Sequence, residues 1–106
     1  MANPWTGEVA LTLDGVPHVA KLTLGALAEL EAGLGTGTLV ELVERFESGR
    51  FSTRDVLMLI VAGLRGGGWK GTAADLMSVE IGGGPVEAAR LAGELLARAF
   101  TVPGAG

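Results

Sequence analysis

The sequence predicts an α+β fold, in which an N-terminal β-hairpin is followed by a compact bundle of four to five short helices. Two observations carry this prediction. Near the N-terminus, apolar residues alternate on both sides of an Asp-Gly pair, as they do in a two-stranded ribbon. From Thr23 onward, apolar residues recur every three to four positions between helix start and stop signals. We expect one domain over residues 1–106, with the hairpin at 7–22, helices at 23–100 and a flexible tail at 101–106.

The hairpin prediction rests on alternation in residues 8–13, which gives the first strand one apolar face. That face consists of Val9, Leu11 and Leu13. Asp14-Gly15 follows and favours a type I′ turn, because both central positions of that turn need φ > 0. In the second strand, over 16–22, Pro17 has no N–H to donate, which indicates an open edge. A lone hairpin is barely stable in water, so we expect it to pack on the helices or to add to a neighbouring subunit.

Threonines mark the start of the first two helices. Thr23 is placed to cap a helix over 24–34, which Gly35 ends. Thr38 and Glu41 have the spacing of a capping box, in which each side chain satisfies the other residue's amide. The second helix then has apolar residues at the i, i+3, i+4, i+7 spacing and stops at Gly49. The apolar stripes of the two helices are Leu27, Leu30 and Leu34, and Leu39, Leu42, Val43 and Phe46.

A third helix is predicted over 53–65, with Asp55 near its positive end. Residues 56–64 are apolar nearly all round, so this helix should be the central and most buried one. A short fourth helix is expected over 72–79, and Pro85 suits the first turn of a last helix that runs to Phe100. The core face of the last helix is predicted to be Ala88, Leu91, Ala92, Leu95 and Ala99, with Glu87, Arg90, Glu94 and Arg98 on the other side. The glycine clusters at 66–68 and 82–84 are interpreted as flexible joints.

Composition disfavours several classes of protein. The chain has 106 residues, no cysteine and a formal net charge of −4, so neither a disulfide framework nor a basic nucleic-acid footprint is present. The longest uncharged helical stretch, 56–64, is far shorter than the roughly 20 residues of a membrane span. The N-terminus lacks the basic and apolar regions of a secretory signal. The absence of cysteine fits a reducing compartment, and we expect a cytoplasmic protein without nucleic-acid or membrane partners.

Catalytic and metal-binding patterns are weak. His18 is the only histidine and stands in a predicted strand, which favours a surface or cross-strand role. Residues 66–71 match G-x-G-x-x-G, yet the motif follows a helix and not a strand, so we interpret it as an interhelical loop. The acidic residues of 29–47 fit the solvated faces of amphipathic helices. A helix-turn-helix around 45–54 would present an apolar recognition helix, which cannot read base edges. We therefore expect a non-enzymatic protein with no cofactor and no metal.

Three residues are candidates for partner binding. Trp5 and Trp69 lie in predicted loops, and exposed tryptophan is enriched at interface hot spots. Met77 offers a soft, adaptable apolar contact. The tryptophans have alternatives: Trp5 covers the hairpin, and Trp69 belongs to the core. The edge of the hairpin is a further candidate, because it could accept a strand from another chain.

Several strings along the chain resemble a known family. They include Asn-Pro-Trp-Thr-Gly-Glu-Val-Ala-Leu-Thr-Leu-Asp-Gly at 3–15, Leu-Thr-Leu-Gly-Ala-Leu-Ala-Glu-Leu-Glu at 22–31, Gly-Arg-Phe-Ser-Thr-Arg-Asp-Val at 49–56 and Ala-Gly-Leu-Arg-Gly at 62–66. With them the chain resembles the small phage-derived tail proteins of gene transfer agents in alphaproteobacteria, specifically those similar to phage tail assembly chaperones. The resemblance covers almost the full chain and rests on a recurring pattern without catalytic residues.

The resemblance implies a non-enzymatic tail assembly chaperone that shields the tape-measure protein until the tail tube polymerises around it. The tape-measure protein is the implied partner, tail tube proteins are a second candidate, and self-association is left open. Members of the family are also described as tail tube proteins, so a structural tail component is the alternative. Shielding apolar helices requires apolar grooves and no ATP site.

Overall fold

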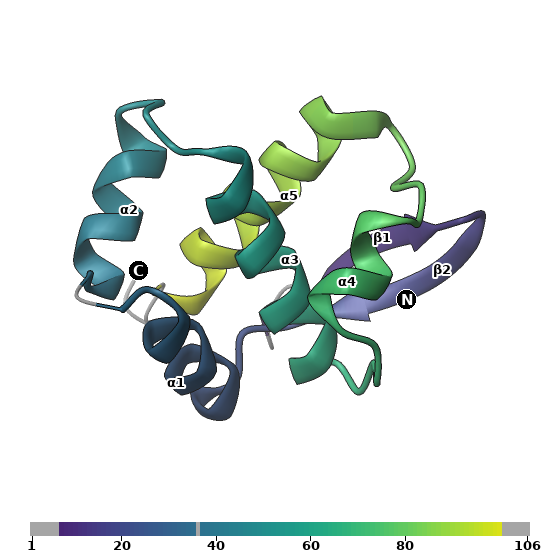
Figure 1. The fold of residues 1–106 in the computed structure, drawn as a ribbon, viewed down its shortest axis with the longest axis horizontal. Coiled ribbons are helices and arrows are strands. Elements are labelled where there is room, and N and C mark those ends of the chain that lie inside the picture. Colours follow the sequence, from purple (N-terminus) through teal and green to yellow (C-terminus); the bar gives the residue numbers. More distant parts are fainter. Residues whose placement is uncertain (1–6, 36, 101–106) are drawn as a thin grey trace.

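The computed structural model describes residues 7–35 and 37–100, which form a hairpin followed by helices, as predicted (Figure 1). The prediction of an α+β fold is therefore confirmed. The elements are β1 (Val9–Leu13), β2 (Val16–Ala20), α1 (Leu24–Gly33), α2 (Leu39–Glu47), α3 (Thr53–Gly66), α4 (Ala73–Met77) and α5 (Gly84–Ala99).

The hairpin closes through the expected type I′ geometry, with φ of 49° at Asp14 and 80° at Gly15. Its strands are antiparallel, and Leu11 lies opposite His18. The predicted apolar face of β1 is buried. The second strand ends at Ala20 and not at residue 22, because the amide of Lys21 leaves the ladder and donates to the carbonyl of Gly63 in α3, at 2.8 Å.

The segment that precedes α5 covers the outer edge of β1 at its turn end. Ile81 forms a bridge with Leu13, and the amide of Gly82 donates to the carbonyl of Thr12 at 2.9 Å. Asp14 and Glu80 exchange two bonds: the Asp14 amide donates to the Glu80 carbonyl at 2.8 Å, and the Glu80 amide donates to the Asp14 carboxylate at 2.9 Å. The outer edge of β1 is therefore partly occupied by this chain, whereas the open edge predicted at Pro17 belongs to β2.

Asp14 thus has two roles, and Asp14→Ala should lower the free energy of unfolding by about 2 kcal/mol. Alanine at φ > 0 costs about 1 kcal/mol, and the lost bond to the Glu80 amide costs about 1 kcal/mol more. Asp14→Asn is the matched control, because asparagine tolerates this φ and keeps an acceptor oxygen. Urea denaturation followed by circular dichroism measures the free energy of unfolding of both variants. An equal loss in the two variants would contradict the explanation.

Helix α3 is the centre of the molecule, as predicted. It contacts α1, α4, α5 and β2 (Figure 1). Leu59, Ile60 and Leu64 on this helix are completely buried. Helix α5 packs behind α3 and also contacts β1, so the hairpin lies on the same core as the two long helices. On α5 the buried face includes Leu96, which the sequence pattern missed, whereas Ala99 is only partly buried.

The predicted cap of α1 is present, and that of α2 is present in part. Thr23 accepts a bond from the amide of Ala26 at 3.0 Å, and complete capping boxes begin α3 and α4. At the start of α2, the Thr38 hydroxyl accepts a hydrogen bond from the amide of Glu41 at 3.2 Å, which is one of the two bonds of the predicted capping box. Helix α4 ends at Met77 and not at residue 79, because the amides after it turn to acceptors three residues back, a tighter geometry that closes the helix.

The interpretation of residues 66–68 as a flexible joint is wrong for two of the three glycines. The backbone of Gly66 lies against the carbonyl of Lys21, and that of Gly67 against the carbonyl of Val19. A Cβ at either position would overlap these oxygens. The glycines therefore allow the end of α3 to meet the end of the hairpin.

Candidate partner-binding site

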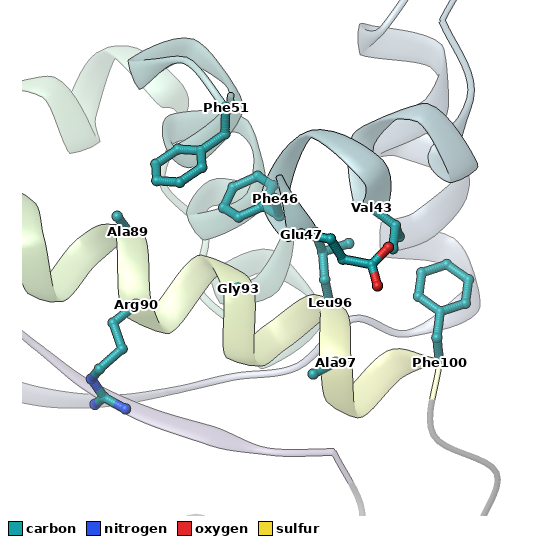
Figure 2. Close-up of a pocket in the computed structure, with 10 residues that line it drawn as sticks. All are labelled: Val43, Phe46, Glu47, Phe51, Ala89, Arg90, Gly93, Leu96, Ala97 and Phe100. Carbon is teal, nitrogen blue, oxygen red and sulfur yellow. The ribbon is translucent and has the colours of Figure 1, made fainter. Parts of the chain in front are cut away.

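A groove between α2 and α5 gathers all three phenylalanines of the sequence (Figure 2). We call it the phenylalanine groove. Its lining residues are Val43, Phe46, Glu47, Phe51, Ala89, Arg90, Gly93, Leu96, Ala97 and Phe100. The rings of Phe46 and Phe51 stack with centroids 4.5 Å apart and planes 8° from parallel, and Phe100 is half exposed at the other end. The volume of the groove is about 440 Å³.

An ion pair connects the α2 wall of this groove to α3. Arg45 donates to both carboxylate oxygens of Asp55, each at 2.9 Å, and the Ser52 amide donates to the same carboxylate at 2.9 Å. Burial of Asp55 would raise the pKa of its carboxyl, but the bonds from Arg45 and Ser52 outweigh burial and lower the pKa. The carboxylate therefore stays charged at neutral pH, and the pair joins α2 to the start of α3.

A second groove lies beside the first, between the start of α3, α4 and the start of α5. We call it the methionine groove, because Met77 stands on its wall with 74% of its surface exposed. It has a volume of about 610 Å³. Its walls are mostly apolar and comprise Phe51, Ser52, Thr53, Val56, Leu57, Ile60, Leu76, Met77, Val79, Glu80, Ile81, Gly84, Pro85, Ala88 and Ala89. Phe51 and Ala89 line both grooves, so the two grooves adjoin along α5, and we refer to them together as the trough.

The trough has few charged groups. Arg90 lies at the edge of the phenylalanine groove, but its guanidinium points away from the rings (Figure 2) and pairs with Glu87 and Glu94, at 2.6 and 2.9 Å. The predicted charged side of α5 is thereby confirmed as a ladder of ion pairs, which continues from Glu94 to Arg98. Among the described residues, one acidic residue lines each groove: Glu47 in the phenylalanine groove and Glu80 in the methionine groove. Such a surface can bind an apolar partner.

The structure separates the predicted binding residues. Met77 lies in the trough, so its exposure agrees with the proposal of a contact residue. Trp69 follows α3 and is partly buried against the core. Its ring covers Gly71, and with Arg65 and Lys70 it lines a small hollow. Trp5 lies outside the described residues. The binding roles of all three remain predictions.

Sequence reasoning missed the phenylalanines as a surface feature. The apolar pattern places Phe46 in the core stripe of α2, but Phe46 is only partly buried, and Leu42 is the one buried residue of this helix. A signal was present: Phe46 and Phe51 are five residues apart across a helix end, a separation that lets the chain fold back and stack the rings. Phe100 joins them only through the packing of α5, which no local pattern specifies.

Two searches of the described residues for other kinds of site were negative. Within 7–35 and 37–100, no group of three His, Cys, Asp or Glu side chains could hold a metal ion. Across the same ranges, no helix has both the length and the apolar character that crossing a membrane requires.

Comparison with known proteins assigns the family. The model of the family described as "Phage tail tube protein, GTA-gp10" matches residues 6–102, which is nearly the whole chain. No curated protein and no solved structure matches the chain. The match confirms the resemblance to a tail protein of gene transfer agents that the sequence strings indicated. The chain belongs to the GTA-gp10 family of phage tail tube proteins.

Proposed function

We propose that this protein is a non-enzymatic assembly factor for the phage-like tail, which covers apolar helices of the tape-measure protein in the cytoplasm until the tube forms around them. The observation that carries the proposal is the apolar trough along α5, which is open to solvent and wide enough for apolar side chains. A groove between helices binds an amphipathic helix through anchors at i, i+3 or i+4, and i+7. Such binding shields apolar surface and is reversible.

A built-in tail component is the second candidate, and the description of the family favours it. Association with other tail proteins follows from either role. The sheet favours the assembly factor. A tube wall that closes through strand pairing needs free strand edges. Here Ile81 bridges β1 next to the turn, and Pro17 in β2 cannot donate to a further strand.

Introducing charge into the trough should abolish the shielding. The double variant Met77→Asp with Phe100→Asp is expected to weaken binding of the tape-measure protein by about a thousandfold, because two apolar hot spots of about 2 kcal/mol each contribute about 4 kcal/mol. The measurement is the soluble fraction of tape-measure protein after co-expression with each variant. Leu24→Asp with Val40→Asp is the matched control, since these exposed apolar residues lie outside the trough. Equal solubility with both double variants would exclude the trough as the shielding surface.

Mass spectrometry of purified particles separates the two candidate functions. An assembly factor should be scarce in mature particles, whereas a tail component should be present in the stoichiometry of a ring or a tube. Finding the chain in stoichiometric amounts would overturn the proposed function in favour of the structural role.

The soluble fraction of tape-measure protein expressed alone serves as the baseline for the co-expression experiment.

A further inference from the structure

Two acidic residues that line the trough, Glu47 and Glu80, form no ion pair within the described part of the chain. Glu47 stands on the α2 wall of the phenylalanine groove, where its carboxylate lies near Val43 and Phe100 (Figure 2). Glu80 stands on the wall of the methionine groove. Both residues are exposed, and neither is among the ion pairs of residues 7–35 and 37–100. Each groove is thus lined by one exposed acidic residue that has no ion pair within the described residues.

Among the described residues, Arg90 is the one cation that lines the trough, and it does not offset these charges. Arg90 is held between Glu87 and Glu94, and its bonds to Glu87 lower the pKa of that carboxyl. Its guanidinium is turned away from the rings (Figure 2). A partner that enters the trough therefore meets apolar walls and an excess of negative charge.

We infer that the trough selects an amphipathic helix whose apolar face is bordered by lysine or arginine, with the basic side chains paired to Glu47 and Glu80. The inference rests on the proposed function and adds the chemistry of the partner. Charge complementarity of this kind decides which partner is accepted, because like charges placed opposite each other are repelled. A helix with an acidic border would bring further carboxylates beside Glu47 and Glu80.

The length of the trough wall sets the length of the partner. Helix α5 has 16 residues, which corresponds to about 24 Å at a rise of 1.5 Å per residue. A partner helix of about four turns would span both grooves and place apolar anchors against Phe46, Phe100 and Met77. Its long basic side chains can reach carboxylates on the rims while their methylene groups cover apolar surface.

Two synthetic helical peptides of about 16 residues, which span about 24 Å at that rise per residue, test the inference. They share one leucine face, and its borders are lysine in one peptide and glutamate in the other. Fluorescence anisotropy with the full chain should show that the lysine peptide binds at least about tenfold more tightly, a preference that decreases as salt is added. The double variant Glu47→Lys with Glu80→Lys should abolish or reverse this preference.

A second double variant with the same change in net charge is the control. Glu31→Lys with Glu44→Lys alters exposed residues that do not line the trough, so it should keep the preference for the lysine peptide. Circular dichroism establishes that both variants are folded. Equal binding of the two peptides, no binding of either, or an unchanged preference in the Glu47 and Glu80 variant would overturn the inference.

The inference and the proposed function can fail separately. If the lysine peptide binds the trough but co-expression does not solubilise the tape-measure protein, the proposed function is wrong and the selectivity stands. If the tape-measure protein is solubilised equally by the wild type and by the Glu47 and Glu80 variant, the shielding function stands and the inferred selectivity is wrong.

Discussion

Gly66→Ala should lower the free energy of unfolding by about 3 kcal/mol, the upper end of ordinary overpacking costs. Helix propensity alone predicts the opposite, since alanine inside a helix is about 1 kcal/mol more favourable than glycine. Packing outweighs propensity here, because a Cβ at Gly66 would overlap the carbonyl oxygen of Lys21 and press on Ala26. The contact is with backbone, which cannot turn aside as a flexible side chain can. Relief would require α3 to move away from the hairpin.

Gly25→Ala is the matched control for this prediction. Gly25 also lies in a helix, and a Cβ there would meet only the Thr23 hydroxyl oxygen at 3.9 Å, an ordinary contact. This substitution should raise the free energy of unfolding by about 0.5–1 kcal/mol. Urea denaturation of the two variants and the wild type measures both changes. If Gly66→Ala were as stable as the wild type, the close approach of α3 to the hairpin would be wrong.

Asp55→Ala is expected to cost about 3 kcal/mol at pH 7, which is the lower end of the range for breaking a buried ion pair. Asp55 is only 7% exposed, and its loss leaves Arg45 without the two bonds that hold α2. The side chain of Arg45 is 33% exposed, so water compensates part of its charge, and this places the cost at the lower end. The substitution also removes the capping box with Ser52. Because α2 forms one wall of the trough, the variant should bind partners less tightly as well.

The same residue predicts the acid dependence of stability. Because the folded state lowers the pKa of Asp55, its contribution is fully present above the ordinary aspartate pKa of about 3.9 and is lost as pH falls through the lower folded value. Wild type should therefore lose stability below about pH 4. In Asp55→Ala, this part of the decrease in the free energy of unfolding with falling pH should be missing. Urea denaturation repeated from pH 7 to pH 3 measures the slope.

Asp75→Ala is the control, because Asp75 forms an equivalent capping box with Thr72 at the start of α4 but is exposed and has no arginine partner in the described chain. Its loss should cost only about 1 kcal/mol, the usual value for a helix cap. If Asp55→Ala and Asp75→Ala lowered the free energy of unfolding equally at pH 7, the ion pair with Arg45 would contribute nothing beyond the helix cap.

Local sequence patterns predicted the features that depend on neighbours in the chain. Asp14-Gly15 specified the turn, because few residue pairs adopt two successive positive φ values. Thr23 specified a helix start, because its hydroxyl satisfies an amide three residues away. The apolar run at 56–64 predicted the central helix, because only a buried site accommodates apolar side chains all round.

The site was less predictable, because its residues come from separate parts of the chain. Met77 was identified from its type and position, but the groove beside it needs the start of α3 and the start of α5. The phenylalanine groove needs residues of α2 and residues of α5 to face each other, although the two helices are far apart in sequence. The pair of Arg45 and Asp55, ten residues apart, joins α2 to the start of α3. The residues that line each groove are not spaced at a helix or strand period along the chain, so no sequence pattern reveals either groove.

By itself, the sequence determined the α+β class, the turn, most helix boundaries and the central helix, because each of these follows from backbone preferences and apolar periodicity over a few residues. It also identified the family of tail proteins, which the match over 6–102 confirmed. The tertiary structure alone decided that Gly66 and Gly67 are contact points, that Ile81 covers the hairpin edge, and that three phenylalanines and Met77 share one trough. These features depend on how elements far apart in the chain approach one another, and that approach is set by packing of the whole core.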